Sequence, residues 1–237
     1  MKMEFKGFIK TSVIEYPGKI VSVAFVGGCN FRCPFCQNPD LVLNSQSFPS
    51  ISEKEVIDHL LSRRKWLDGL VITGGEPMLE KDLPNFLSKI KKEGFLVEIE
   101  TNGTNPGMLR DLVKRSLIDY LALDIKAPFE WEKYSKAAGI VDENLFGKVK
   151  ESVKILSGSN IDYELRTTVV PGLVDQEDLI SIARSFGNVK KYVLQQFVPK
   201  ITLDKQYEKI KPYSKDKLEE MKEKIADYVE FCEIRGV

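Results

Sequence analysis

VSVAFVGGCNFRCPFCQNPD, residues 21–40, joins an apolar run to a loop that holds three of the four cysteines in this 237-residue chain. Residues 21–27 are mostly apolar and β-branched, which is typical of a parallel strand buried on both faces. The loop opens with two glycines and spaces its thiols as Cys29-x3-Cys33-x2-Cys36. The stretch therefore predicts a buried strand that carries reactive side chains at its C-terminal end.

Similar runs recur along the chain and alternate with amphipathic helical patterns. Five more strands are predicted, at residues 69–75, 95–103, 119–126, 162–170 and 191–198. A capping box of Ser52 and Glu55 begins one helix, and Ser214 begins the last one, which carries Cys232 on its apolar face at about residues 214–233. Six strand–helix units without a Pro/Gly/Ser-rich linker predict one domain with a parallel sheet. They leave an open or doubly wound sheet and a partial barrel as alternatives.

Composition excludes several classes of protein. Lys+Arg and Asp+Glu are equal at 35 each, which argues against a broad nucleic-acid or membrane surface. No apolar run approaches the ~20 residues of a membrane-spanning helix, and the charged N-terminus lacks the apolar region of a signal peptide. We therefore expect a cytoplasmic protein with no nucleic-acid or membrane partner, whose clustered thiols are reduced and bind metal rather than form disulfides.

The number of thiols, three, restricts which kinds of metal site the loop can form. Structural zinc takes four nitrogen or sulfur ligands, but the remaining candidates, Cys232 and the single His59, are distant in the sequence. Ferredoxin-type clusters also use a fourth cysteine. Three thiolates on a four-iron cluster would leave one iron open to a substrate, as catalytic zinc keeps one position open.

Polar motifs end the other predicted strands. They are TGGEP at 73–77, ETNG at 100–103, DIK at 124–126, RTTVVPG at 166–172 and a pair of glutamines at 195–196. Taken singly, each also fits a turn or a polar strand end. In the first motif, two glycines would let the backbone approach a ligand, and Glu76 would supply negative charge nearby.

Taken together, these motifs resemble a known family. Cys-x3-Cys-x2-Cys with Phe35 before its last cysteine resembles the signature of the radical S-adenosylmethionine (SAM) enzymes, and TGGEP resembles their GGE motif. The ETNG, DIK and RTTVVPG motifs resemble elements of glycyl-radical-enzyme activases. The resemblance implies an α/β fold, a partial (β/α)6 TIM-like barrel with parallel strands in a single domain over residues 1–237. It divides that domain into an N-terminal extension at 1–19, a cluster loop at 27–40 and the C-terminal helix.

The resemblance also implies cofactors and the residues that bind them. It implies one [4Fe-4S] cluster on Cys29, Cys33 and Cys36, with SAM at the open iron. The SAM-binding residues that it implies are Phe35, Gln37, Gly74, Gly75, Glu76, Asp124, Lys126, Arg166 and Gln196. A monovalent cation at Glu100 and Asp124 is a further expectation. Gln37 and Gln196 depart from the family, in which histidine is usual at both positions.

The same resemblance implies the reaction. Activases of this kind use the 5′-deoxyadenosyl radical from reductive SAM cleavage to form a glycyl radical on a partner enzyme, and they receive electrons from a flavodoxin- or ferredoxin-type donor. GFIKTSVIEYPGK at residues 7–19 resembles the activating proteins of anaerobic (class III) ribonucleoside-triphosphate reductase, which is the expected partner. The alternatives are a radical SAM enzyme acting on a small molecule, similar to 7-carboxy-7-deazaguanine synthase, and a non-enzymatic iron–sulfur or zinc protein.

Overall fold

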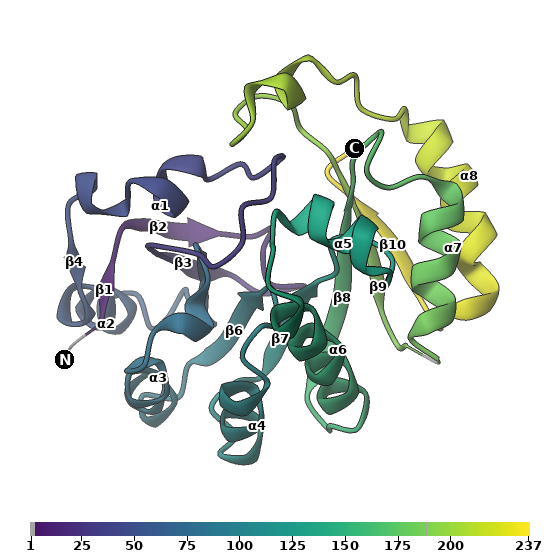
Figure 1. The fold of residues 1–237 in the computed structure, drawn as a ribbon. Coiled ribbons are helices and arrows are strands. Elements are labelled where there is room, and N and C mark those ends of the chain that lie inside the picture. The colour runs from purple at the N-terminus through teal and green to yellow at the C-terminus, as the bar shows by residue number, and fades with distance from the viewer. Residues whose placement is uncertain (1–2, 188) are drawn as a thin grey trace.

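A computed structural model describes residues 3–187 and 189–237 of the chain. A curved eight-stranded sheet dominates it, in the order β10-β9-β8-β7-β6-β5-β3-β2 (Figure 1). The strands are β2 (Gly7–Ser12), β3 (Val21–Val26), β5 (Gly69–Gly74), β6 (Leu96–Thr101), β7 (Tyr120–Asp124), β8 (Asp162–Val169), β9 (Tyr192–Gln196) and β10 (Cys232–Arg235). β2 pairs antiparallel with β3, and the other neighbouring strands pair in parallel. The predicted partial barrel of parallel strands is thereby confirmed.

Helices surround the sheet and follow its strands in the chain (Figure 1). They are α1 (Pro39–Leu43), α2 (Glu53–Ser62), α3 (Leu83–Lys92), α4 (Pro106–Lys114), α5 (Trp131–Ala138), α6 (Glu143–Ser157), α7 (Gln176–Ser185) and α8 (Lys215–Ile225). β1 (Glu4–Phe5) and β4 (Ile51–Ser52) form a second, two-stranded antiparallel sheet. In the described ranges, no helix combines the length and the apolar character that crossing a bilayer requires.

Local sequence signals place these helices as expected. Ser52 and Glu55 form the capping box of α2, and the Ser214 side chain accepts a hydrogen bond from the Lys217 amide at the start of α8. Such caps satisfy the amides of the first helical turn, which have no partner inside the helix. The six strands predicted from apolar runs are β3, β5, β6, β7, β8 and β9.

The C-terminal segment differs from its prediction. α8 ends at Ile225, and Cys232 begins β10 instead of lying on a helix face. β10 pairs in parallel with β9, with Cys232 opposite Tyr192. The strand satisfies backbone groups that β9 would otherwise leave unpaired at the edge of the sheet. This long-range pairing, rather than local propensity, decides the structure of the last residues.

The two ends of the barrel are closed differently. We call the end where the parallel strands begin the floor, and the end where they finish the mouth. At the floor, a small buried cluster contains Tyr16, Val21, Val23, Val71 and Tyr120, with the two tyrosine rings 5.4 Å apart. At the mouth, the loops that carry the polar motifs surround a cavity.

Candidate functional site

One cavity at the mouth collects every site residue that the sequence predicted. It has a volume of about 300 Å³. The predicted residues that line it are Cys29, Cys33, Phe35, Cys36, Gln37, Gly74, Gly75, Glu76, Glu100, Asp124, Lys126, Arg166 and Gln196. Cys232 lies on β10 and is not among the lining residues. Motifs scattered over most of the chain thus meet because parallel strands bring their C-terminal ends to one edge of the sheet.

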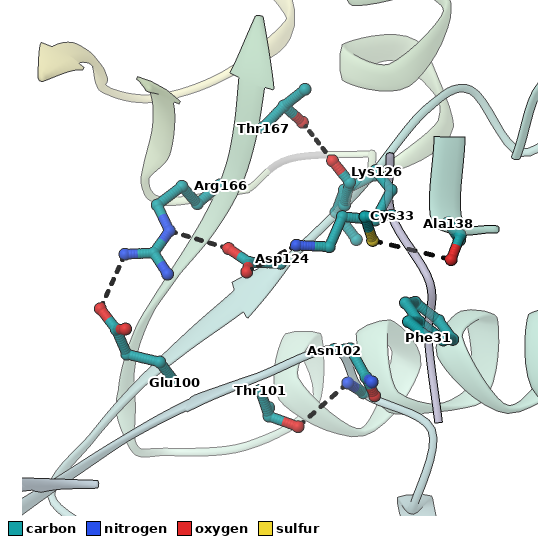
Figure 2. Close-up of polar contacts among 12 residues, drawn as sticks. Phe31, Cys33, Glu100, Thr101, Asn102, Asp124, Lys126, Ala138, Arg166 and Thr167 are labelled. Carbon is teal, nitrogen blue, oxygen red and sulfur yellow. Dashed lines mark hydrogen bonds and ion pairs between the residues drawn. The ribbon is translucent and has the colours of Figure 1, made fainter. Parts of the chain in front are cut away.

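The cysteine loop is held from outside by the C-terminus of α5. The carbonyl of Ala138 accepts a hydrogen bond from the Arg32 amide at 2.9 Å and from the Cys33 thiol at 3.7 Å (Figure 2). Gly139, which follows, has φ +62°, and a Cβ at this position would lie 2.1 Å from the Arg32 carbonyl oxygen. Only glycine allows this close approach. α5 therefore fixes the backbone on which Cys33 sits.

The glycines of the TGGEP motif pack against the same loop from inside. A Cβ on Gly75 would lie 1.8 Å from the carbonyl oxygen of Gly28, and the Glu76 amide donates to that oxygen at 2.8 Å. The sequence assigned these glycines to close approach of a ligand. In the structure, Gly75 allows two backbone segments to approach each other closely. These are the end of β5 and the start of the cysteine loop.

Glu76 is buried and satisfied by the protein. Its carboxylate accepts hydrogen bonds from the Thr101 hydroxyl at 2.6 Å, the Asn102 amide at 2.7 Å and the Met78 amide at 3.0 Å. Burial raises the pKa of Glu76 to about 7, although these three donors act in the opposite direction. Glu76 therefore ties the loop after β5 to the loop after β6.

A belt of charged side chains crosses the cavity wall (Figure 2). The Arg166 guanidinium donates to Glu100 Oε1 and to Asp124 Oδ1, both at 2.8 Å. Lys126 Nζ bonds Asp124 Oδ2 at 2.8 Å, and the Thr73 hydroxyl donates to Glu100 Oε2 at 2.7 Å. Burial acts to raise the pKa of Asp124, but Arg166 and Lys126 hold it well below its usual range. The belt contains two carboxylates, Glu100 and Asp124, and two cations, Lys126 and Arg166, so their charges balance.

The belt includes both residues of the expected monovalent cation site, Glu100 and Asp124. Each of the four carboxylate oxygens of Glu100 and Asp124 already accepts a hydrogen bond from a side chain. The guanidinium of Arg166 lies between the two carboxylates (Figure 2). It supplies one positive charge to both carboxylates, and a monovalent cation at Glu100 and Asp124 stays a prediction.

The side chains of the two glutamines bond the two ends of one segment, residues 198–213. Gln37 Nε2 donates to the Val198 carbonyl at 3.0 Å, and Gln196 Nε2 donates to the Tyr213 carbonyl at 2.9 Å. The Asp204 amide in the same segment donates to the Pro34 carbonyl at 2.9 Å. Both side chains thus position the segment of residues 198–213 over the cysteine loop. Gln196 Oε1 is buried without a hydrogen-bond partner among the described residues, so it is left as an acceptor beside the cavity.

Burial favours the protonated form of two of the three thiols, Cys29 and Cys33. Burial raises the pKa of Cys29 to about 11 and that of Cys33 to about 12. Binding of metal requires thiolates and releases these protons. Within the described residues, no three His, Cys, Asp or Glu side chains converge closely enough to share a single metal ion.

Sequence reasoning gave no role to several residues around the thiols. Asn102 and Thr104 follow β6, and their side chains connect to Asn30 beside Cys29. Asn102 belonged to a recognised motif, but its contact with the cysteine loop depends on the pairing of β5 with β6 and of β3 with β5. Thr73 and Gln195 also line the cavity.

A partial barrel with three thiols at its mouth and no fourth thiol among the lining residues defines a class, the radical SAM enzymes. A radical SAM superfamily model matches residues 23–184. A Methanocaldococcus jannaschii protein named as a glycyl-radical enzyme activating enzyme, MJ1227, is 34% identical over 239 residues, which is 100% of this chain and 98% of that protein. The pyruvate formate-lyase-activating enzyme of Clostridium pasteurianum is 25% identical over 92% of this chain and 94% of its own length.

A solved structure shares the fold. Streptococcus suis SuiB bound to S-adenosylmethionine aligns with a TM-score of 0.70 at 17% identity, over 91% of this chain and 50% of SuiB. The chain thus spans about half the length of that structure. The protein belongs to the radical SAM superfamily and, within it, to the glycyl-radical enzyme activating enzymes. The cofactors of this family are a [4Fe-4S] cluster and SAM, and a cavity with three thiols, a buried free acceptor and a charged belt fits both.

Proposed function

We propose that this protein cleaves SAM reductively at a [4Fe-4S] cluster held by Cys29, Cys33 and Cys36, and that it thereby generates a glycyl radical on a partner enzyme. The observation that carries the proposal is the shared cavity, in which three thiols face the charged belt of Glu100, Asp124, Lys126 and Arg166. Cluster and SAM, when bound, supply one-electron reduction and a hydrogen-abstracting radical; the protein supplies ligation, orientation and exclusion of competing reactions.

The belt residues would bind the charged end of SAM. Lys126 and Arg166 are cations at the cavity wall, and both are held in place by Asp124. A ligand carboxylate would compete with Asp124 for these cations, whereas a ligand amino group would be attracted to the acids. Gln196 Oε1, buried without a partner among the described residues, would accept a hydrogen bond from a ribose hydroxyl.

The cysteine loop would receive its rigidity from three contacts. α5 holds Cys33 through the Ala138 carbonyl, Gly75 packs on Gly28, and the Asp204 amide bonds Pro34. A radical reaction needs the reacting groups fixed close together and water excluded. The partner's glycine loop would complete that exclusion by entering the mouth of the barrel.

We further propose an anaerobic (class III) ribonucleoside-triphosphate reductase as the partner and a flavodoxin or ferredoxin as the electron donor. The segment GFIKTSVIEYPGK supports the choice of partner by its resemblance to that group. In the structure it forms β2 and the loop that brings Tyr16 to the floor of the barrel.

The test is activation of the reductase from the same genome. Reconstituted protein, SAM, a reductant and the reductase should together give a glycyl-radical signal by electron paramagnetic resonance (EPR), and the Cys33→Ala variant should give none. Production of 5′-deoxyadenosine without any radical on the reductase would exclude this partner while retaining SAM cleavage. Absence of 5′-deoxyadenosine from protein with a full cluster would overturn the proposed reaction itself.

A further inference from the structure

The amide side chain of Asn102 lies against the first thiol of the cysteine loop. Asn102 follows β6 and is only 5% exposed. Its Nδ2 is 3.8 Å from Cys29 Sγ and 2.9 Å from Asn30 Oδ1. Its backbone amide donates to Glu76 Oε2 at 2.7 Å. The residue is therefore held at both its backbone and its side chain.

Neighbouring donors fix which end of the amide faces the sulfur. Asn102 Oδ1 accepts from the Thr104 backbone amide at 3.0 Å and from the Thr104 hydroxyl at 2.7 Å. A backbone amide can only donate, so the atom facing it must be the oxygen. Asn30 Nδ2 donates to Thr104 Oγ1 at 2.8 Å and closes a ring of three side chains. The nitrogen of Asn102 must therefore point toward Cys29 and Asn30.

The two hydrogens of this nitrogen have separate acceptors. One is directed to Asn30 Oδ1 and the other to Cys29 Sγ. Cys29 Sγ also accepts from the Phe31 backbone amide at 3.3 Å. Cys33 differs, because its own thiol donates to the Ala138 carbonyl. Two donors from the protein thus gather on the sulfur of Cys29.

We propose that Asn102 is a positioning residue that raises the reduction potential of the cluster through an N–H···S hydrogen bond to Cys29. This inference rests on the proposed function, in which Cys29 ligates the cluster. Reduction adds negative charge that is shared by the ligand sulfurs, and a donor to one sulfur stabilises that charge. Asn102 would thus make the cluster easier to reduce before SAM is cleaved.

Two substitutions remove the donor in different ways. Asn102→Asp keeps the size of the side chain and an acceptor for Thr104, but replaces the donor with a carboxylate oxygen. Asn102→Ala removes the donor without adding charge. Asn105→Asp is the matched control, because Asn105 lies nearby in the chain and bonds the Met78 carbonyl and the Met108 amide rather than a thiol. Aspartate also serves as the N-cap of α4, which Asn105 provides.

The measurement is the midpoint potential of the reconstituted cluster, by EPR-monitored redox titration with and without SAM. Both Asn102 variants should titrate at a more negative potential than the wild type at equal iron content, whereas Asn105→Asp should shift it less than either. A fully loaded Asn102→Ala protein with the wild-type potential would overturn the inference. Wild-type protein that binds no four-iron cluster would instead overturn the proposed function.

A measurement on the wild type covers the case in which the variants fail to load a cluster. Protein labelled with ¹⁵N only in asparagine side chains should show nitrogen coupling to the reduced cluster by pulsed EPR. Two other asparagines lie near the thiols. The Asn30 side-chain amide is directed to Thr104, and Asn38, which lines the cavity, is excluded as the source if the coupling persists in the Asn38→Ala variant. A reduced cluster without such coupling would contradict the hydrogen bond.

Discussion

Two layers of charged side chains lie inside the barrel, and only one of them faces the cavity. β6 contributes Glu100 to the upper layer and Glu98 to the lower one, and β8 likewise contributes Arg166 and Glu164. Residues two apart on a strand point to the same face and lie roughly 6.6 Å apart along it. The same pair of strands thus contributes side chains to both layers.

The layers differ in how their charges are matched. In the upper belt, every carboxylate oxygen has a donor. In the lower layer, Glu164 accepts from Tyr120 at 2.8 Å and from Arg235 at 2.8 and 3.0 Å. Glu98, 1% exposed, has no hydrogen-bond partner for either oxygen within the described residues. The two layers also differ in what covers them. Tyr16 and β10 close off the lower layer, whereas the upper layer lines the cavity. Only the upper layer is therefore open to a ligand.

The largest predicted difference between the mouth and the floor is the effect of replacing a cysteine. Cys33→Ala should abolish the [4Fe-4S] EPR signal and the formation of 5′-deoxyadenosine, because a required ligand is lost. Cys232→Ala, at the β10 edge of the sheet, should leave both at the wild-type level. The measurements are iron content, EPR and chromatography of the SAM cleavage products. SAM cleavage at the wild-type rate by the Cys33→Ala variant would contradict the assignment of the thiols.

A second pair of substitutions compares two half-buried arginines, Arg166 in the upper layer and Arg235 in the lower layer. Arg166→Gln removes the cation that pairs with Glu100 and leaves Asp124 with Lys126, whereas Arg235→Gln leaves Glu164 with Lys191. Each substitution should cost up to about 3 kcal/mol of unfolding free energy. Only Arg166→Gln should also weaken SAM binding, by about tenfold or more, since a charge-assisted hydrogen bond contributes roughly 1.5–3 kcal/mol.

Denaturant unfolding and SAM titration at equal cluster loading separate these two effects. Equal loss of SAM affinity in both variants would show that the lower layer acts on the cavity and is not merely structural. An Arg166→Gln protein that binds SAM normally would exclude the belt from the SAM site.

The sequence predicted the upper layer far better than the lower one, for a physical reason. Apolar runs located β3 and β5 to β9, and motifs at the ends of these strands had to meet once the sheet was parallel. Cluster ligation and SAM contacts by particular residues stay predictions. The lower layer depends on β10, whose pairing of Cys232 with Tyr192 spans a long stretch of chain. A local pattern that also fits the end of a helix could not reveal it.

Individual contacts at the mouth could not be predicted either, because they too depend on how distant segments pack together. TGGEP was recognised as a motif, but the reason for Gly75, its packing on Gly28, required both loops in place. Arg166 was expected to bind a ligand, and its pairing with Glu100 and Asp124 was not foreseen. That Arg166 bridges these acids follows only from the register of β7 and β8, which sets Asp124 opposite Arg166.

The smallest predicted effect is a pH dependence of the unfolding free energy that is due to Glu98. It is also the effect most specific to the lower layer. Burial, followed by the charges of Glu100 and Glu164, raises the pKa of Glu98 well above its usual value. The folded protein therefore holds this proton more tightly than the unfolded chain does. The stability that Glu98 contributes is complete below the pKa of the unfolded chain and is lost as pH rises through the native pKa.

Glu98→Gln removes this titration while keeping the size of the side chain. Its unfolding free energy relative to wild type should therefore rise between pH 5 and pH 8.

For Glu164 the stability changes with pH in the opposite direction. Its pKa is lowered, because the interactions with Arg235 outweigh the effect of burial. Glu164→Gln should thus be less stable than wild type at pH 7, and its deficit should shrink as pH falls through the native pKa. Denaturant unfolding at several pH values measures both slopes. A Glu98→Gln difference that does not change with pH would show that Glu98 titrates normally, and the floor would then be no more closed to water than the mouth.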